Sequence, residues 1–369
     1  MKGIWKYEQL LPRIGSAYQL SIGEGGTPLV RSKHIGPALG LKNLYFKLEN
    51  LNPSGSYKDR FAAIALSQIQ EQGVGFCLAT SSGNTGAALA AYSAVARIPC
   101  FLAIVDGAPE GKLTQMGAYG AETLMVKDFG KDVGVTQDTM ALLEQIALSY
   151  DSVVQVSAFR YSPSAMQGVQ TIAYEIAEQL GQEKAQVFVP AGGGGLTLAI
   201  CKGFDRWAEV FSDYVKPTIH CVQPEGNDTI ATAIRNQLQQ ATAIAMSTTA
   251  VSGLQVPGVL DGDEVLKYCM NNAGMGHTVQ DEEVFAWQQR LALEEGIFCE
   301  PAGAVALAGL ANALKNKEID TAAAAVCIVT GHGFKDPVSV QCMAAASDLL
   351  YMENTTVLEK YLKTRVKRK

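Results

Sequence analysis

The chain has 369 residues, of which 48% are hydrophobic and 18% charged. This length exceeds what one hydrophobic core usually supports, and this composition excludes a disordered chain, so we expect a two-lobed globular fold. The last ten residues hold six Lys or Arg and no acidic residue, which leaves a net charge of −12 on the first 359 residues. An acidic body argues against a nucleic-acid partner, and a basic terminus is most often simply solvated.

The cysteines and the amino terminus indicate the compartment. Eight cysteines lie at least fifteen residues apart, mostly in apolar strings and without zinc-ligand spacing. This pattern predicts reduced, buried thiols and no metal site. The sequence has neither the apolar core of a signal peptide nor a run of roughly 18 apolar residues, so we expect a soluble, cytoplasmic protein without a membrane partner.

From about residue 44 onward, short apolar runs alternate with longer helical patterns, which is typical of βαβ units and parallel sheets. The predicted strands are 44–48, 76–79, 100–105, 123–126, 153–156, 187–190, 218–222 and 325–330. The predicted helices are 61–70, 86–96, 136–148, 168–180 and 284–295. We therefore predict an α/β fold with two doubly wound lobes, a smaller one over 40–156 and a larger one over 1–39 plus 157–369.

The first motif of chemical interest, NPSGSYKDR, runs from Asn52 to Arg60. This turn-rich loop leads directly into a helical pattern and therefore places Lys58 at a helix start. The positive end of the helix dipole and burial both favour an uncharged amine, which is a good nucleophile toward an aldehyde. The alternative interpretation is an ordinary surface lysine beside Asp59.

A second motif, SSGNTG at 81–86, follows a predicted strand and precedes an Ala-rich helix. Backbone N–H groups, three hydroxyls and an amide converge where the helix begins, which suits a carboxylate ligand. The alternative is a helix cap followed by a glycine turn.

The third motif, PAGGGGL at 190–196, again joins a strand to a helix. Four consecutive glycines let the backbone wrap an anion with N–H groups alone, and a phosphate is the natural guest. The motif lacks the endings of nucleotide and dinucleotide loops, so ATP and NAD fit less well. A purely structural glycine turn is the alternative.

The fourth motif, VTGHGFKD at 329–336, follows an apolar strand. Thr330 falls at the carboxyl end of that strand, where open α/β sheets bind ligands. Its hydroxyl can hydrogen-bond a ring nitrogen without adding negative charge. His332 is either a proton shuttle or a structural residue of the turn.

A nucleophilic lysine, a carboxylate loop, a phosphate cup and a neutral ring-nitrogen partner, in this order, describe a pyridoxal phosphate site. The motifs NPSGSYKDR, SSGNTG, PAGGGGL, EGIFCEPAGAVALAGL and TGHGFKD together resemble those of threonine synthases, in the tryptophan synthase β-subunit superfamily of fold type II. The resemblance covers most of residues 20–340, and Glu24, Gly25 and Thr27 in IGEGGTPL match its opening signature. It implies that pyridoxal 5'-phosphate binds in the cleft between two lobes, held by the larger lobe, while the smaller lobe moves.

The resemblance also implies a role for each candidate residue. Lys58 would bond to the cofactor and act as the base, Asn84 would contact the phenolic oxygen, and Thr330 the ring nitrogen. The residues that would cradle the cofactor phosphate are Gly192, Gly193, Gly194, Gly195 and Leu196. The residues that would hold the substrate carboxylate are Ser81, Ser82 and Thr85. Glu300 would lie near the cofactor or cap a helix.

The implied activity is a pyridoxal-phosphate-dependent carbon–oxygen lyase or synthase in a homodimer, acting on a small amino acid with a β- or γ-leaving group. Family members that use O-phosphohomoserine have cations in NPxRxxGQKT and SGLRVP, where this chain has Ala165, Gln170 and Gln255. Arg160 is the cation that remains close in sequence, and we expect it among the substrate-binding residues. The losses argue against a phosphorylated substrate and favour a neutral or acetylated leaving group.

The alternatives are therefore a serine/threonine dehydratase or a β-replacement enzyme similar to cysteine, cysteate or diaminopropionate synthases. A cofactor-binding carrier or sensor is the non-enzymatic alternative. The intact Lys58 and carboxylate loop disfavour a carrier.

Overall fold

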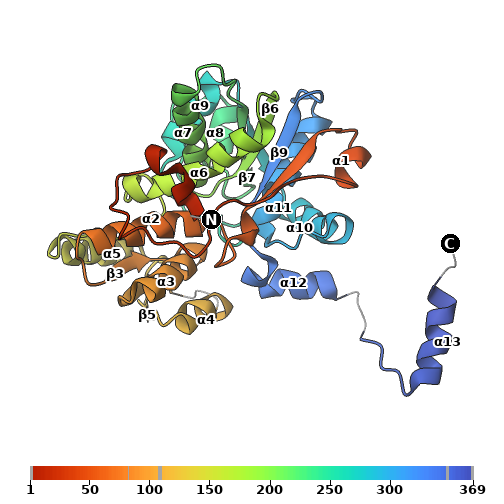
Figure 1. The fold of residues 1–369 in the computed structure, drawn as a ribbon, viewed down its shortest axis with the longest axis horizontal. Coiled ribbons are helices and arrows are strands. Elements are labelled where there is room, and N and C mark those ends of the chain that lie inside the picture. Colours follow the sequence, from red (N-terminus) through yellow and green to blue (C-terminus); the bar gives the residue numbers. More distant parts are fainter. Residues whose placement is uncertain (1–2, 82, 107–109, 346–348, 367–369) are drawn as a thin grey trace.

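Two sheets of unequal size form the framework of the molecule (Figure 1). The computed structural model describes residues 3–81, 83–106, 110–345 and 349–366. The larger sheet has six strands in the order β1-β2-β9-β6-β7-β8, and the smaller has three in the order β3-β4-β5. All strand pairs are parallel except β1 with β2, which confirms the predicted α/β class.

The strands are β1 Leu29–Arg31, β2 Leu44–Leu48, β3 Cys77–Thr80, β4 Cys100–Ile104, β5 Glu122–Met125, β6 Ala185–Pro190, β7 Thr218–Pro224, β8 Gly276–Val279 and β9 Ala324–Val329. The α-helices are α1 Ile35–Ala38, α2 Lys58–Glu71, α3 Asn84–Ala96, α4 Glu110–Ala118, α5 Val133–Leu148, α6 Pro163–Leu180, α7 Gly195–Val210, α8 Ala231–Arg235, α9 Gly262–Asn271, α10 Asp281–Arg290, α11 Pro301–Lys315, α12 Pro337–Ala344 and α13 Thr355–Arg365. Further helical segments are η1 Gly3–Leu10, η2 Glu49–Leu51, the π-helical η3 Leu291–Glu295 and η4 Gly333–Lys335.

Alternate residues of the central strands are buried on opposite faces of the larger sheet. In β6, Val187 and Val189 join the core cluster of α2, α6 and α7, whereas Phe188 joins the cluster of α11. β9 divides in the same way, with Val326 facing the first cluster and Cys327 the second. Because helices cover both faces, these strands contain almost only apolar residues, and this is why their apolar runs are visible in the sequence.

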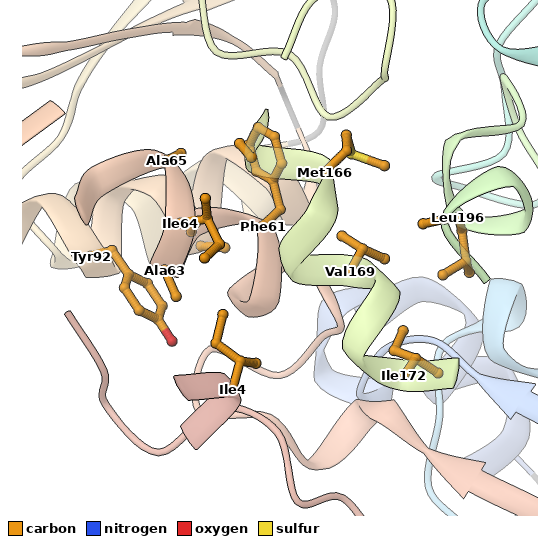
Figure 2. Packing of buried hydrophobic residues seen from close by; sticks show 14 of the residues in the cluster. Ile4, Phe61, Ala63, Ile64, Ala65, Tyr92, Met166, Val169, Ile172 and Leu196 are labelled. Carbon is orange, nitrogen blue, oxygen red and sulfur yellow. The ribbon is translucent and has the colours of Figure 1, made fainter. Parts of the chain in front are cut away.

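Helix α2 connects the two sheets. It packs against α6 beside the larger sheet and against α3 beside the smaller one. Phe61 and Ile64 of α2 lie beside Met166 and Val169 of α6 in one continuous core cluster (Figure 2). Burying each such side chain contributes about 1.5–3 kcal/mol. Lys58, the first residue of α2, therefore starts on a helix that the core holds firmly.

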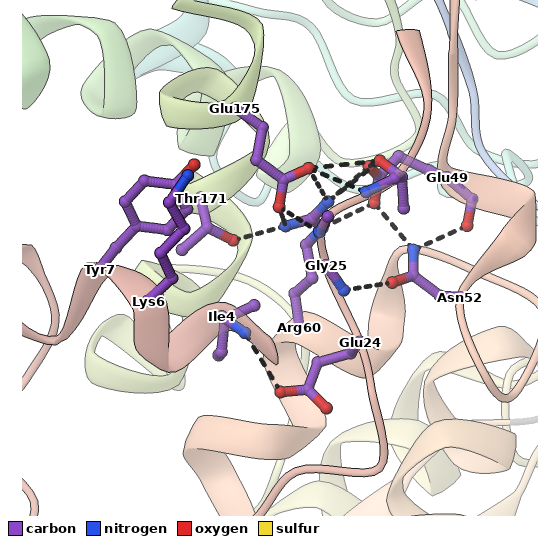
Figure 3. Close-up of polar contacts among 12 residues, drawn as sticks. Ile4, Lys6, Tyr7, Glu24, Gly25, Glu49, Asn52, Arg60, Thr171 and Glu175 are labelled. Atoms are coloured by element: carbon purple, nitrogen blue, oxygen red, sulfur yellow. Dashed lines mark hydrogen bonds and ion pairs between the residues drawn. The ribbon is translucent and has the colours of Figure 1, made fainter. Parts of the chain in front are cut away.

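Arg60, two residues after Lys58, is fully buried in a cluster of charged side chains (Figure 3). Its guanidinium donates to both carboxylate oxygens of Glu49 and of Glu175 at 2.7–2.8 Å. Lys47 Nζ also donates to Glu175, at 2.6 Å. Burial alone would raise the pKa of Glu175, but the charges of Arg60 and Lys47 hold that pKa well below its usual range. We call these four residues the Arg60 cluster.

Neutral groups complete the Arg60 cluster and connect it to the opening segment. Thr27 Oγ1 donates to Glu49 at 2.6 Å, and Gly26 N donates to Glu175 at 2.7 Å. Thr171 Oγ1 accepts from Arg60 at 2.8 Å. The IGEGGTPL segment thus supports the buried charges that fix β2, α2 and α6 to one another.

The structure differs from the predicted elements in several places, and helices α4, α9 and α12 were not predicted. Residues 153–156 form no strand: Gln155 makes a single bridge to Ala79 before the chain turns away. β1 and β8 were not predicted because each is only three or four residues long and β8, GHTV, contains no apolar run. β2 falls inside the predicted smaller lobe but belongs to the larger sheet, because Leu44–Leu48 pairs in register with β9.

The carboxyl-terminal helix α13 stands apart from the rest of the molecule (Figure 1). None of its residues is buried, and its Lys and Arg side chains are exposed, as expected for a solvated basic terminus. Within the described ranges, no helix has the length and apolar character needed to cross a membrane.

Candidate active site

A cavity of about 1170 Å³ lies at the carboxyl ends of strands from both sheets. Its walls include residues at or just beyond the ends of β3, β4, β6 and β9, namely Thr80, Val105, Pro190 and Thr330. The predicted site residues that line it are Lys58, Ser81, Asn84, Thr85, Gly192, Gly193, Gly194, Gly195, Leu196 and Thr330. Ser82 lies outside the described residues. Four motifs thus meet in one cavity, although Lys58 and Thr330 are 272 residues apart in sequence, as the topology of parallel sheets requires.

Lys58 enters the cavity from the first turn of α2. Its Nζ donates to Ser157 Oγ at 2.6 Å and lies 4.7 Å from the centre of the Tyr57 ring. Tyr57 N donates to Thr330 O at 3.2 Å, so the backbone that carries the lysine is tied to the end of β9.

Ser157 was missed by the sequence analysis. It is the first hydroxyl after the segment predicted as the strand 153–156, and that position was a signal that could have identified it.

The loop before α3 is organised by Ser81. Its Oγ accepts from Gly83 N at 3.2 Å and from Gly86 N at 3.1 Å. The hydroxyl therefore satisfies amides at the start of α3 and keeps its own proton to donate. Asn84 and Thr85 begin the helix beside it.

The glycine cup, residues 192–195, joins β6 to α7. Gly194 has φ +96°, a conformation that L side chains rarely adopt. A Cβ on Gly193 would come within 2.8 Å of Leu260, and one on Gly192 within 2.9 Å of Val256. Glycines are thus required both by the backbone and by the loop that closes over the cup. Exposed N–H groups at the start of α7 make this end of the cavity suitable for an anion.

Thr330 is buried, and its Oγ1 has no hydrogen-bond partner among the described residues. A buried hydroxyl without a partner costs free energy, about 1–3 kcal/mol. Such a group in a cavity wall indicates a ligand that completes the hydrogen bond.

Arg160 does not line the cavity. Its backbone N donates to Asp261 at 3.1 Å, and its exposed guanidinium lies 5.9 Å from the centre of the Tyr161 ring. Sequence proximity to the substrate motif therefore does not bring this cation to the cavity, because the long-range contact with Asp261 sets the course of the chain.

Of the three positions that lack the family's cations, only Gln255 lines the cavity. Its Nε2 donates to Thr249 O at 2.8 Å. Ala165 is buried in the first turns of α6, and Gln170 accepts from Tyr174 in the same helix at 3.0 Å.

Three further candidates have other surroundings. His332 does not line the cavity. It is the residue before η4, and its Nδ1 caps that helix by accepting from Phe334 N at 3.4 Å. Glu24 accepts from the Tyr92 hydroxyl at 2.6 Å, away from the cavity. Glu300 does line the cavity, and its Oε1 accepts from Asn84 Nδ2 at 2.9 Å.

The fold and the cavity define an α/β enzyme that binds its ligands at the carboxyl ends of parallel strands. More narrowly, the chain belongs to the family described as pyridoxal-phosphate dependent enzyme, whose model matches residues 20–331. It is 35% identical to the threonine synthase of Methanocaldococcus jannaschii over 91% of this chain and 81% of that protein. It is 32% identical to the threonine synthase of Halalkalibacterium halodurans, over 90% of this chain and 89% of that one.

Solved structures share the fold at lower identity. The processed form of threonine deaminase isoform 2 from Solanum lycopersicum superposes with a TM-score of 0.71 at 20% identity, over 94% of both chains. Maize serine racemase superposes with a TM-score of 0.67 at 21% identity, over 92% of both chains. These structures are of fold type II, which confirms the predicted fold.

The residues present fit the family's cofactor. The glycine cup offers N–H groups to a phosphate, the unpartnered Thr330 Oγ1 can bond a ring nitrogen, and Lys58 provides an amine for the aldehyde. Ser157 and Asn84 also line the cavity that contains the glycine cup, Thr330 and Lys58.

Proposed function

We propose that the chain is a threonine synthase-like, pyridoxal-phosphate-dependent carbon–oxygen lyase acting on a small amino acid with a β- or γ-leaving group. The observation that carries the proposal is the meeting of Lys58, the glycine cup and the unpartnered Thr330 hydroxyl in one cavity. Bound there, the cofactor supplies an electron sink for negative charge that develops on the amino acid.

Lys58 would hold the cofactor through its amine, and as a free amine it would be the base of the site. Ser157 Oγ, 2.6 Å from Nζ, fixes the position of the amine and gives its proton a partner. A lysine held in this way can remove a proton at one carbon and return it at another on the same face.

The start of α3 binds the substrate carboxylate. Ser81 and Thr85 present hydroxyls, and the helix N-terminus favours the negative charge. Ser82 belongs to the same proposed group. Closure of the smaller lobe over this loop would exclude water from the reaction.

Thr330 would hydrogen-bond the ring nitrogen as a neutral partner. A hydroxyl does not stabilise a protonated ring as a carboxylate would, so the site favours elimination and addition over transamination. Glycines 192–195 and Leu196 would hold the cofactor phosphate with their N–H groups.

A second candidate function concerns the leaving group. Among the described lining residues, the side-chain cations are Lys58 and Lys335, and Lys335 Nζ donates to Gln115 at 2.6 Å. Gln255 in the wall is neutral. This wall favours a neutral leaving group, as in a serine/threonine dehydratase or a β-replacement enzyme, over a phosphate dianion.

We further propose that the enzyme works as a homodimer in the cytoplasm. The buried free thiols at seven of the eight cysteines fit a reducing compartment. Exposed apolar side chains on η4 and α12, including Phe334 and Val338, offer a surface that a second copy could cover.

Product analysis by mass spectrometry tests both candidates. The enzyme is incubated in parallel with O-phosphohomoserine, O-acetylserine, serine and threonine, each with and without added sulfide, sulfite or ammonium as the nucleophile. Threonine with released phosphate would identify a threonine synthase and remove the second candidate. Oxo-acid and ammonia, or a replaced side chain, would support the second candidate. Turnover of none of the four, with cofactor bound, would contradict the proposed lyase activity on these substrate classes.

A further inference from the structure

Glu300 is a buried carboxylate in the cavity wall that the proposed chemistry does not use. It is 2% exposed and lines the cavity together with Asn84 and Thr330. Its Oε1 accepts from Asn84 Nδ2 at 2.9 Å. A hydrogen bond to a buried carboxylate is worth more than one between neutral groups, so this contact holds the amide firmly.

A helix-capping role does not explain this side chain. Glu300 occupies the residue before α11, where a carboxylate normally accepts from the first N–H groups of the helix. No such side-chain bond is formed, and the Gly303 N–H of the first turn donates instead to the backbone O of Glu300 at 2.9 Å. The carboxylate is therefore directed toward Asn84 rather than toward its own helix.

The neighbouring backbone leaves room for this contact. Glu300 N donates to Gly331 O at 3.0 Å, which sets the two segments side by side. A Cβ on Gly331 would come within 2.2 Å of Glu300 Oε1 and 3.2 Å of Asn84 Nδ2. Only glycine at this position permits the carboxylate and the amide to meet.

The contact joins the two halves of the cavity. Asn84 begins α3, directly after β3 of the smaller sheet. Glu300 precedes α11, which packs on β6, β8 and β9 of the larger sheet. This one hydrogen bond thus fixes the position of Asn84, beside the smaller sheet, relative to Glu300, beside the larger sheet.

The contact with Glu300 leaves Asn84 one N–H group to donate to a ligand. An Asn Nδ2 carries two hydrogens, and the bond to Glu300 uses one of them. Because the carboxylate can only accept, it also decides which end of the amide is the nitrogen. The second hydrogen is then available to a negatively charged ligand atom in the cavity.

We propose that Glu300 is the positioning residue for Asn84: it orients the amide so that its second N–H is presented to the phenolic oxygen of the bound cofactor. This inference rests on the proposed function, which assigns that oxygen to Asn84. Glu300 acts through Asn84 and needs no contact of its own with the cofactor.

A double-mutant cycle on cofactor binding tests the proposal. Dissociation constants for pyridoxal 5'-phosphate are measured by fluorescence titration of cofactor-free wild type, Glu300→Ala, Asn84→Ala and the double variant. We expect Glu300→Ala to weaken binding about tenfold in the wild-type background and less than about twofold in the Asn84→Ala background. Glu300→Gln keeps an acceptor but adds a donor and removes the charge, so it should recover only part of the loss.

The visible spectrum of the bound cofactor provides a second readout. Loss of the N–H donor should increase the short-wavelength band of the protonated phenol in both single variants, and to the same extent in the double variant. Glu283→Gln is the matched control, because Glu283 accepts from Asn312 Nδ2 at 3.1 Å and does not line the cavity. It should leave both readouts unchanged.

The outcomes separate the inference from the proposed function. Additive losses in the cycle, or an unchanged spectrum in Glu300→Ala with wild-type circular dichroism, would overturn the positioning role. Borohydride reduction is carried out on every protein: if wild type fixes no cofactor on Lys58, the proposed function fails. If it does so and the cycle is additive, only the inference fails.

Discussion

The Arg60 cluster and the cavity wall are both buried and polar, and they lie within a few residues of each other along α2, yet they are built in opposite ways. In the cluster, each of the four charged groups has a partner of opposite charge. In the cavity, Lys58 Nζ donates to a neutral hydroxyl, and Thr330 Oγ1 has no partner among the described residues.

The difference separates the two roles of buried polar groups. Charges that satisfy one another fix the elements that carry them, so the cluster holds α2 against β2 and α6. Groups left incompletely satisfied in a cavity await a ligand. Arg60 therefore supports the helix from which Lys58 reaches the cavity.

The largest expected effect comes from breaking the cluster. Arg60→Ala leaves two buried carboxylates with Lys47 as their remaining charged partner and should lower the free energy of unfolding by about 3–5 kcal/mol. Arg206→Ala is the matched control: it removes an exposed 2.8 Å ion pair with Glu209 and should change stability by less than about 1 kcal/mol. Urea unfolding measures both, and equal effects would refute the distinction.

A buried pair of neutral rings sharpens the comparison. His220 Nδ1 and His277 Nε2 lie 3.0 Å apart, near Glu318 and Arg235. Burial lowers the pKa of His220 to about 3 and of His277 to about 4, so both rings are neutral in the folded protein.

Because His220 and His277 are buried as neutral rings, the stability of the folded protein should fall at acidic pH. In the unfolded chain both rings bind protons below pH about 6.5, so their contribution is complete above that pH and is lost as pH falls toward 4. Between pH 7.5 and 5.5 the two rings should account for a loss of about 2–3 kcal/mol, measured by urea unfolding as the difference between wild type and a variant that lacks both rings; Asp59, whose pKa burial raises to about 7, acts in the opposite direction and equally in both proteins. A His220→Gln/His277→Gln variant should lose most of this dependence, whereas His34→Gln should retain it; the reverse pattern would contradict the account.

The smallest effect concerns two buried threonines. Thr330→Val removes an unpartnered hydroxyl and should leave the stability of the cofactor-free protein unchanged or higher by about 1 kcal/mol. Thr171→Val removes the acceptor of Arg60 and should destabilise by about 1–3 kcal/mol. Thermal unfolding of the cofactor-free proteins measures the stability change in both variants. A comparable loss in both variants would mean that Thr330 is already satisfied without a ligand.

Much of the fold and the cavity could be predicted because local patterns encode them. The apolar runs of β6 and β9 predict strands buried on both faces, and the four glycines of the cup at a helix start predict an anion-binding turn. Lys58, Asn84 and Thr330 follow from their places at helix starts and strand ends.

Long-range contacts account for the rest. The partners of Arg60 are eleven and 115 residues away, and no local pattern distinguishes a buried charge from a solvated one. Arg160 was expected near the substrate from sequence proximity, but its place depends on Asp261, 101 residues further on. The contact between Asn84 and Glu300 spans 216 residues for the same reason.

The central claim is that the incompletely satisfied groups of the cavity exist to bind pyridoxal 5'-phosphate on Lys58. Borohydride reduction of the purified, cofactor-loaded enzyme, followed by peptide mass spectrometry, tests it most directly. The account predicts a reduced pyridoxyl phosphate group on Lys58 and its absence in Lys58→Ala. A group fixed on Lys335, the other lysine of the wall, or no fixed cofactor at all, would contradict it.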